Sequence, residues 1–154
     1  MLHAALPPTA RFVVKDDKEK NKRKTTKISI TDSRNSFLLH IKTINDFKPQ
    51  IDSLKQKQLQ LGATIQPLIV VIGSDLFHLD EYYLFFDDNR YKFNDFLTCL
   101  DTCFKLFCVF NLSFPKSSEL VWTFIQKYFY CISTIHDLKS TVLTTFISDF
   151  NKIE

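Results

Sequence analysis

Seven consecutive residues, Pro67-Leu-Ile-Val-Val-Ile-Gly73, decide the fold that this sequence predicts. Four β-branched residues follow one another from Ile69 to Ile72, with no polar residue between them. Such a run is typical of a strand that is covered on both faces and therefore lies in the middle of its sheet. Gly73 marks the end of the strand.

Two shorter strands are predicted after this central one. Tyr82 to Phe86 and Arg90 to Phe93 flank the sequence Asp87-Asp-Asn89. Acidic and amide side chains of this kind favour turns, and we expect Asn89 to adopt a left-handed conformation. The two strands therefore form a hairpin.

A strand and a helix are predicted before the central strand. Phe37 to Ile41 is a short apolar run, and Thr43 can then cap a helix that begins at Ile44. Pro49 lies past the first turn of such a helix. Either the helix begins near Lys48, with the proline at its first position, or it is kinked at the proline.

Three helices are predicted after the hairpin, over 96–111, from a cap at Ser117 or Ser118 to 132, and over 135–151. The resulting order is β-α-β-β-β-α-α-α. It predicts an α+β fold in which a small, mostly antiparallel sheet has its helices packed on one face. We expect one domain of this kind over 36–151.

Residues 1–35 are predicted to form a disordered basic leader. They contain Pro7-Pro8, a charge-dense run and few large apolar residues, so they offer little burial against their ordering entropy. Between Lys15 and Lys27 lie seven basic and three acidic residues, whereas 37–154 holds 11 basic and 13 acidic ones. The net charge of +3 therefore originates in the leader.

Composition restricts the class of protein more than its activity. The chain has 154 residues, 45% hydrophobic and 24% charged, as in a folded soluble domain. It has only two glycines, which excludes most phosphate-cradling loops. The apolar stretch 96–110 is interrupted by Asp101 and Lys105, so we predict no membrane span and no membrane partner.

The four cysteines, at 99, 103, 108 and 131, include no Cys-x-x-Cys pair. We expect them to be reduced and buried as small hydrophobes, which favours an intracellular location in the cytoplasm or nucleus. Cys99 is the one candidate nucleophile, because it falls in the first turn of a predicted helix. No base accompanies it in the sequence.

No catalytic or metal-binding pattern organises the polar residues. The acidic pairs Asp80-Glu81 and Asp87-Asp88 are interpreted as turn residues rather than cation ligands, and the four histidines are scattered. We therefore expect a protein that is not an enzyme and that uses no cofactor and no metal.

Two kinds of binding site are predicted, and the first is for nucleic acid. The basic residues of the leader and of the hairpin could contact phosphates, and the aromatic residues of the hairpin could stack on nucleobases. The candidates are Lys20, Lys22, Arg23, Lys24, Tyr83, Arg90 and Lys92. The alternative for the hairpin is that its aromatics pack under helices, which we favour because Asp87 and Asp88 repel phosphate. The basic run is equally suited to a nuclear-localisation signal or a solvated tail.

The second predicted site is a protein-interaction surface on the helix after Ser118. Trp122, Tyr128 and Tyr130 are the candidates, because we expect them on the exposed half of that helix. The leading functional hypothesis is a non-catalytic protein-interaction module that binds an unidentified protein or a second copy of itself. A nucleic-acid-binding protein is the alternative.

Three stretches resemble a group of animal proteins without an assigned activity. They are Gln66-Pro-Leu-Ile-Val-Val-Ile-Gly73, the region from Leu100 to Pro115 that contains LDTCFKLF, and Val121 to Tyr130 with the sequence VWTFIQKYFY. Some members of this group are associated with mobile elements, and some carry this region behind a separate interaction or DNA-binding domain. The resemblance covers about 36–132 and implies no functional residue.

Overall fold

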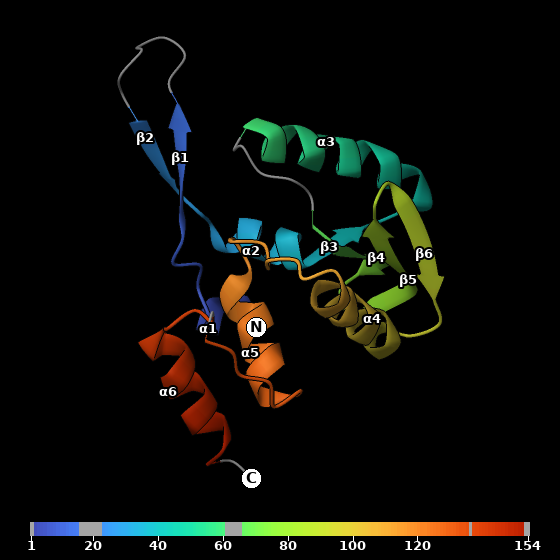
Figure 1. The fold of residues 1–154 in the computed structure, drawn as a ribbon. Coiled ribbons are helices and arrows are strands. Elements are labelled where there is room, and N and C mark those ends of the chain that lie inside the picture. Colours follow the sequence, from blue (N-terminus) through green and yellow to red (C-terminus); the bar gives the residue numbers. More distant parts are fainter. Residues whose placement is uncertain (1, 16–22, 61–65, 136, 153–154) are drawn as a thin grey trace. The chain divides into compact units, whose positions relative to one another are not determined.

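The computed structural model describes residues 2–15, 23–60, 66–135 and 137–152 (Figure 1). The chain forms two compact units that are interleaved in sequence. The sheet unit comprises residues 11–27 and 38–113, and the helical unit comprises residues 1–10, 28–37 and 114–154.

The main sheet of the sheet unit has four strands in the order β3-β4-β5-β6. β3 (Leu38–Ile41) pairs in parallel with β4 (Leu68–Asp75), which pairs antiparallel with β5 (His78–Phe86). β5 then pairs antiparallel with β6 (Asn89–Phe93). The predicted central strand is therefore confirmed as an inner strand of a mostly antiparallel sheet, in an α+β fold.

One face of this sheet is covered by α3 (Phe47–Gln60), which follows the short 3₁₀ helix η1 (Ile44–Asp46) (Figure 1). Thr43 is the residue before η1, as predicted, and its backbone N–H donates to the Asp46 carboxylate at 3.1 Å. Alternate strand residues meet α3 in one apolar cluster, made by Leu39, Ile41, Phe47, Ile51, Leu68, Val70, Ile72, Tyr83 and Phe85. Pro49 lies in the first turn of α3, where a missing N–H is tolerated.

The opposite face of the sheet is covered by α4 (Phe96–Val109) (Figure 1). Tyr82 and Phe86 of β5 contact Phe96 and Phe110 at ring-centroid distances of 6.3 and 5.4 Å. The prediction that the helices pack on one face is therefore wrong for this sheet. The reason is that β4 is apolar at every position from Leu68 to Ile72, so each face needs its own cover.

The β5–β6 hairpin has a two-residue turn formed by Asp87 and Asp88. Their φ angles are 49° and 61°, so both take the left-handed conformation that a type I′ turn requires. Asn89 was predicted to take this conformation, but it is the first residue of β6. The turn therefore ends one residue earlier than expected. Asn89 is paired with Phe86 across the two strands, so only Asp87 and Asp88 remain for the loop.

The helical unit contains α1 (Leu2–Ala5), α2 (Ile30–Phe37), α5 (Glu119–Tyr128) and α6 (Thr141–Phe150). Its aromatic residues pack in a chain in which Phe37 contacts Trp122 at 4.9 Å and Trp122 stacks on Phe114 at 5.8 Å. The His3 ring of α1 also contacts the Phe37 ring, with their centroids 5.3 Å apart. Residues near the N-terminus are therefore part of this core.

The structure differs from the predicted division at residue 36. The predicted leader contributes α1 and most of α2 to the helical unit, and its residues 11–15 and 23–27 form a two-stranded ribbon of β1 (Arg11–Lys15) and β2 (Arg23–Lys27). Leu6 and Ile28 are buried. The segment was predicted to be disordered because it has few large apolar residues, but these two are buried in the fold. No helix in the described part of the chain is long and apolar enough to cross a membrane.

Candidate interaction surface

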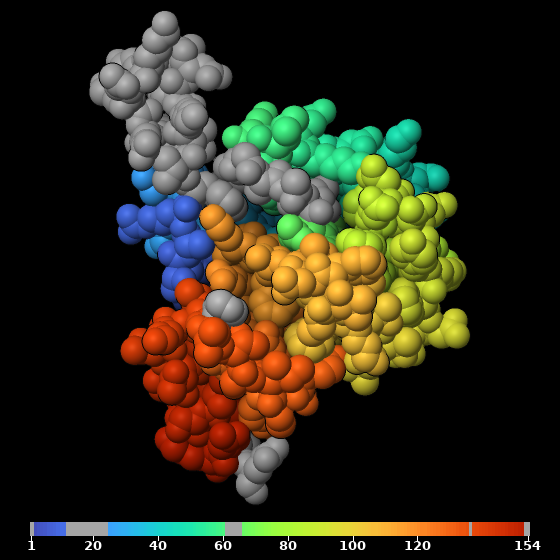
Figure 2. Space-filling view, in the orientation of Figure 1, coloured from blue at the N-terminus to red at the C-terminus, as the bar shows by residue number. Residues whose placement is uncertain are grey.

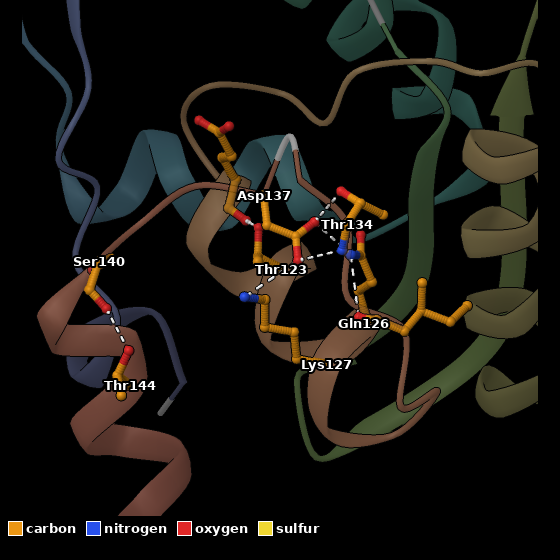
Figure 3. Close-up of polar contacts among 9 residues, drawn as sticks. Thr123, Gln126, Lys127, Thr134, Asp137, Ser140 and Thr144 are labelled. Atoms are coloured by element: carbon orange, nitrogen blue, oxygen red, sulfur yellow. Dashed lines mark hydrogen bonds and ion pairs between the residues drawn. The ribbon is translucent and has the colours of Figure 1, made fainter.

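The carboxylate of Asp137 ties the linker between α5 and α6 to α5 (Figure 3). Asp137 accepts hydrogen bonds from the backbone N–H and the hydroxyl of Thr134, at 3.0 and 2.6 Å. From α5 it also accepts a bond from the Gln126 amide at 2.8 Å and forms an ion pair with Lys127 at 3.2 Å. The linker is therefore tied back onto the last turn of α5.

Asp137 is charged although its side chain is only 8% exposed. Burial raises its pKa, but hydrogen bonds from Thr134 and Gln126 and the Lys127 ammonium outweigh this effect and lower the pKa to about 2. Gln126 uses the same amide nitrogen to reach the Ile132 carbonyl at 3.3 Å. Two points of the linker are thus held by one side chain of α5.

The linker fixed in this way presents three apolar side chains to solvent. Phe129, Ile132 and Ile135 are 66%, 41% and 91% exposed, and we call these three residues the linker surface. α5 was predicted to continue to Ile132, which would have placed Phe129 and Ile132 on its apolar arc. That prediction is wrong, because α5 ends at Tyr128 and Cys131 turns the chain with a φ of 54°.

An aromatic cluster lies beside the linker surface, where α5 and α6 pack together. Phe124 is buried at its centre, within 5.2 to 5.8 Å of the rings of Tyr128, Phe129, Phe146 and Phe150. Figure 2 shows α6 in red at the molecular surface, next to the orange residues of α5 and the linker. Phe129 joins the cluster to the linker surface, and Phe150 extends it, being 38% exposed.

Two ion pairs lie near this apolar surface. Lys127 is paired with Asp137, and Lys152 with Asp149 at 3.0 Å. Each pair is neutral as a unit. Two copies of this surface could therefore approach each other without repulsion between these groups.

Of the three residues predicted to form a partner surface, only Tyr128 and Tyr130 are partly exposed. Trp122 is completely buried between Phe37 and Phe114, so the prediction that it is exposed is wrong. α5 has seven buried residues among its ten, because other helices of the unit cover it on more than one side. Tyr128 and Tyr130 are half-buried, and Tyr128 belongs to the aromatic cluster.

Sequence reasoning missed the linker surface, although one signal was present. Thr134 and Asp137 form a Thr-x-x-Asp pair, the pattern in which a side chain and backbone N–H groups satisfy one another. We had expected the last helix to begin at 135. Instead α6 begins at Thr141, where Ser140 accepts from the Leu143 N–H at 3.3 Å.

The predicted nucleic-acid residues of the hairpin lie on one face of β5 and β6 but cannot stack a base. Tyr83 is 8% exposed and packs against Phe47, while its hydroxyl donates to Glu81 at 2.7 Å. Lys92 donates to the other Glu81 oxygen at 2.6 Å. Arg90 lies over the Phe47 ring at 5.7 Å. The stacking role predicted for Tyr83 is therefore wrong, because α3 covers its ring.

The predicted basic residues of the leader fall into two groups. Lys20 and Lys22 lie outside the described residues. Arg23 and Lys24 begin strand β2.

The cysteines divide into two buried and two exposed thiols. Cys99 and Cys103 are buried in α4, as predicted, whereas Cys108 and Cys131 are exposed. Burial raises the pKa of Cys99 to about 12, an effect that the nearby Asp95 carboxylate adds to. Cys99 is therefore a poor nucleophile. Among the described residues, no group of three or more His, Cys, Asp or Glu side chains is arranged to hold a metal ion.

Comparisons with protein-family models, with curated proteins and with solved structures found no match to this chain.

Proposed function

We propose that this protein is a non-catalytic interaction module that self-associates through the linker surface and the adjoining face of the aromatic cluster. The observation that supports this most is that Phe129 and Ile135 are exposed on a linker that Asp137 fixes in place. Exposed apolar side chains in an ordered segment are typical of a binding surface. Because the segment is already ordered, binding costs little conformational entropy.

A second copy of the chain is the partner that the surface fits best. It is apolar, and the two ion pairs that flank it are neutral as units, so these four groups do not select an acidic or a basic partner. Such a patch is complementary to itself across a two-fold axis, as in most homodimers. The exposed rings would then be buried against their own counterparts.

The test is the molar mass in solution, measured by light scattering after size-exclusion chromatography across a range of protein concentrations. We expect a concentration-dependent dimer. Ile135→Ser changes a side chain that is 91% exposed, so the fold should persist while dimerisation weakens by about tenfold or more. Phe129→Ser should weaken it in the same direction.

Phe77→Ser is the matched control, because Phe77 is 90% exposed in the sheet unit. This variant should dimerise like the wild type. A wild-type chain that stays monomeric at high concentration would refute self-association. An equal loss of dimer in the Phe77 variant would refute the location of the surface.

A further inference from the structure

Strand β6 forms one edge of the main sheet, because among the described strands it is paired only with β5 (Figure 1). Proteins protect edge strands with a proline, a bulge, a covering segment or charged side chains. β6 has no proline, its register with β5 runs without a shift, and four of its five residues are exposed. Charged side chains are therefore the protection that remains at this edge.

The hairpin turn determines which backbone groups of β6 face the open edge. In a two-residue turn the flanking residues, here Phe86 and Asn89, form a hydrogen-bonded pair. Hydrogen-bonded and non-hydrogen-bonded pairs alternate along an antiparallel ladder. Tyr91 is therefore also bonded to β5, whereas the N–H and C=O groups of Arg90 and Lys92 point away from it. These groups can bond to an added strand.

The side chains of Arg90 and Lys92 are held on the face of the sheet that α3 covers. Both stand opposite aromatic residues of β5 that belong to the apolar cluster under α3. The Arg90 guanidinium lies over the Phe47 ring at 5.7 Å. Lys92 is paired with Glu81 at 2.6 Å, whereas Arg90 is in no ion pair with a described residue. A carboxylate opposite Arg90 would supply the missing partner.

A second copy of β6 is unsuitable as the added strand. If two copies pair antiparallel through their outward-directed groups, Arg90 and Lys92 of one strand stand opposite Arg90 or Lys92 of the other. Each such register places a basic side chain opposite a basic one, which is destabilising. The edge therefore disfavours itself and favours a strand with acidic side chains at alternate positions.

We propose that the open edge of β6 binds an extended segment of another protein by antiparallel strand addition, with carboxylates of the segment opposite Arg90 and Lys92. The residue between these carboxylates is apolar and packs against Tyr91, which is 49% exposed on the other face. Main-chain bonds supply the affinity in this mode, and the side chains supply specificity. This function goes beyond self-association, because β6 belongs to the sheet unit and the linker surface to the helical unit.

The probe is the synthetic peptide Ser-Thr-Glu-Val-Glu-Thr-Ser, and a control peptide has lysine in place of both glutamates. Each is titrated to about 1 mM into the isotope-labelled full-length chain, and amide signals and amide hydrogen exchange are followed by NMR. The Arg90 and Lys92 amides should become protected from exchange when the glutamate peptide binds. The Tyr91 amide should change little, because it is already bonded to β5.

The decisive variant is Arg90→Glu, which reverses the charge at an exposed position. It should lower the affinity for the glutamate peptide about tenfold and raise that for the lysine peptide by a similar factor. A gain of affinity cannot result from unfolding of the strand. Lys42→Glu is the matched control, because it makes the same charge change at an exposed residue next to β3, the other edge strand. It should leave both affinities nearly unchanged.

Three outcomes would overturn the proposal. They are no binding of the glutamate peptide, equal binding of the two peptides by the wild type, and equal effects of Arg90→Glu and Lys42→Glu. The first would mean that the basic residues only protect the edge against pairing between copies. None of them bears on self-association, which is measured in the absence of peptide.

Discussion

At the scale of single residues, Asp137 joins the linker to α5 in the helical unit. Its carboxylate receives bonds from two residues of α5 and from Thr134, and its charge is compensated by Lys127. A buried charge is strongly destabilising when its partners are removed. Asp137 therefore contributes to the order of the linker, together with the bonds between Gln126 and Ile132.

Replacement of Asp137 by Ala should lower the free energy of unfolding by about 3 kcal/mol, because it leaves Lys127 without its counter-ion and Gln126 without its shorter hydrogen bond. Chemical denaturation with urea would measure the loss. Asp149→Ala is the control, since the Lys152–Asp149 pair is 71% and 61% exposed. It should cost less than about 0.5 kcal/mol, and equal losses in the two variants would contradict our account of the linker.

His3 makes the stability of the helical unit depend on pH. Its ring bonds to the Ser33 hydroxyl at 3.0 Å, and burial, with a contribution from the Arg34 charge, lowers its pKa from 6.5 to about 4. The folded state therefore keeps His3 neutral at pH values where the unfolded chain is protonated. The contribution of His3 to the free energy of unfolding is therefore complete above pH 6.5 and is lost as the pH falls toward 4.

Between pH 6.5 and 4 the free energy of unfolding should fall on the order of 3 kcal/mol through His3. Urea denaturation at a series of pH values would measure this fall. His3→Gln should flatten the profile in this window, whereas His78→Gln, which changes an exposed histidine, should not. A profile that His3→Gln leaves unchanged would show that another group is responsible.

At the scale of elements, Gly73 allows the junction of β4 and β5 to form. The register shifts on either side of this residue, and its carbonyl accepts a bond from the His40 ring at 2.9 Å if that nitrogen carries the proton. A Cβ at position 73 would lie 2.1 Å from the His78 carbonyl oxygen. That oxygen belongs to the backbone of the paired strand, so it cannot move aside as a flexible side chain would.

Gly73→Ala should therefore destabilise the sheet unit by more than about 2 kcal/mol, by forcing β4 and β5 apart. Thermal unfolding followed by circular dichroism would detect the change. Ser74→Ala, at the next and exposed position, is the control and should be nearly neutral. A Gly73 variant as stable as this control would contradict the close approach of the two strands.

The elements within residues 38–113 were predictable because their signals are local, whereas β1 and β2 of the same unit were not predicted. The apolar run at 68–72 and the cap at Thr43 depend on neighbouring residues alone. The ends of α5 and α6 were not predictable in this way. Residues 129–140 are apolar enough to continue a helix, but the contacts of Gln126 and Lys127 with Asp137 stabilise a folded linker instead.

At the scale of the whole molecule, the sheet unit is nearly continuous in sequence. Residues 38–113 contain the four strands together with α3 and α4. Both faces of β4 are thus covered by helices from the same segment. The helical unit, by contrast, needs three separate parts of the chain.

A fragment of residues 38–113 should therefore fold by itself and unfold cooperatively in urea, as followed by circular dichroism. The fragment 38–93 lacks α4 and is the control. It should aggregate or remain unfolded, because one face of the sheet, including Ile69, Val71 and Leu84, is left without cover. A cooperative transition in 38–93, or its absence in 38–113, would contradict the role we assign to α4.

The sequence by itself determined the α+β class, the central position of β4 and the order of elements from 38 onward. These features follow from runs of apolar residues and from caps, which act over a few positions. Only the tertiary structure decided that α3 and α4 take opposite faces, that residues near the N-terminus join α5 and α6, and that Trp122 is buried while Phe129 and Ile135 are exposed. Each of these depends on contacts between residues far apart in the chain, and no local pattern encodes them.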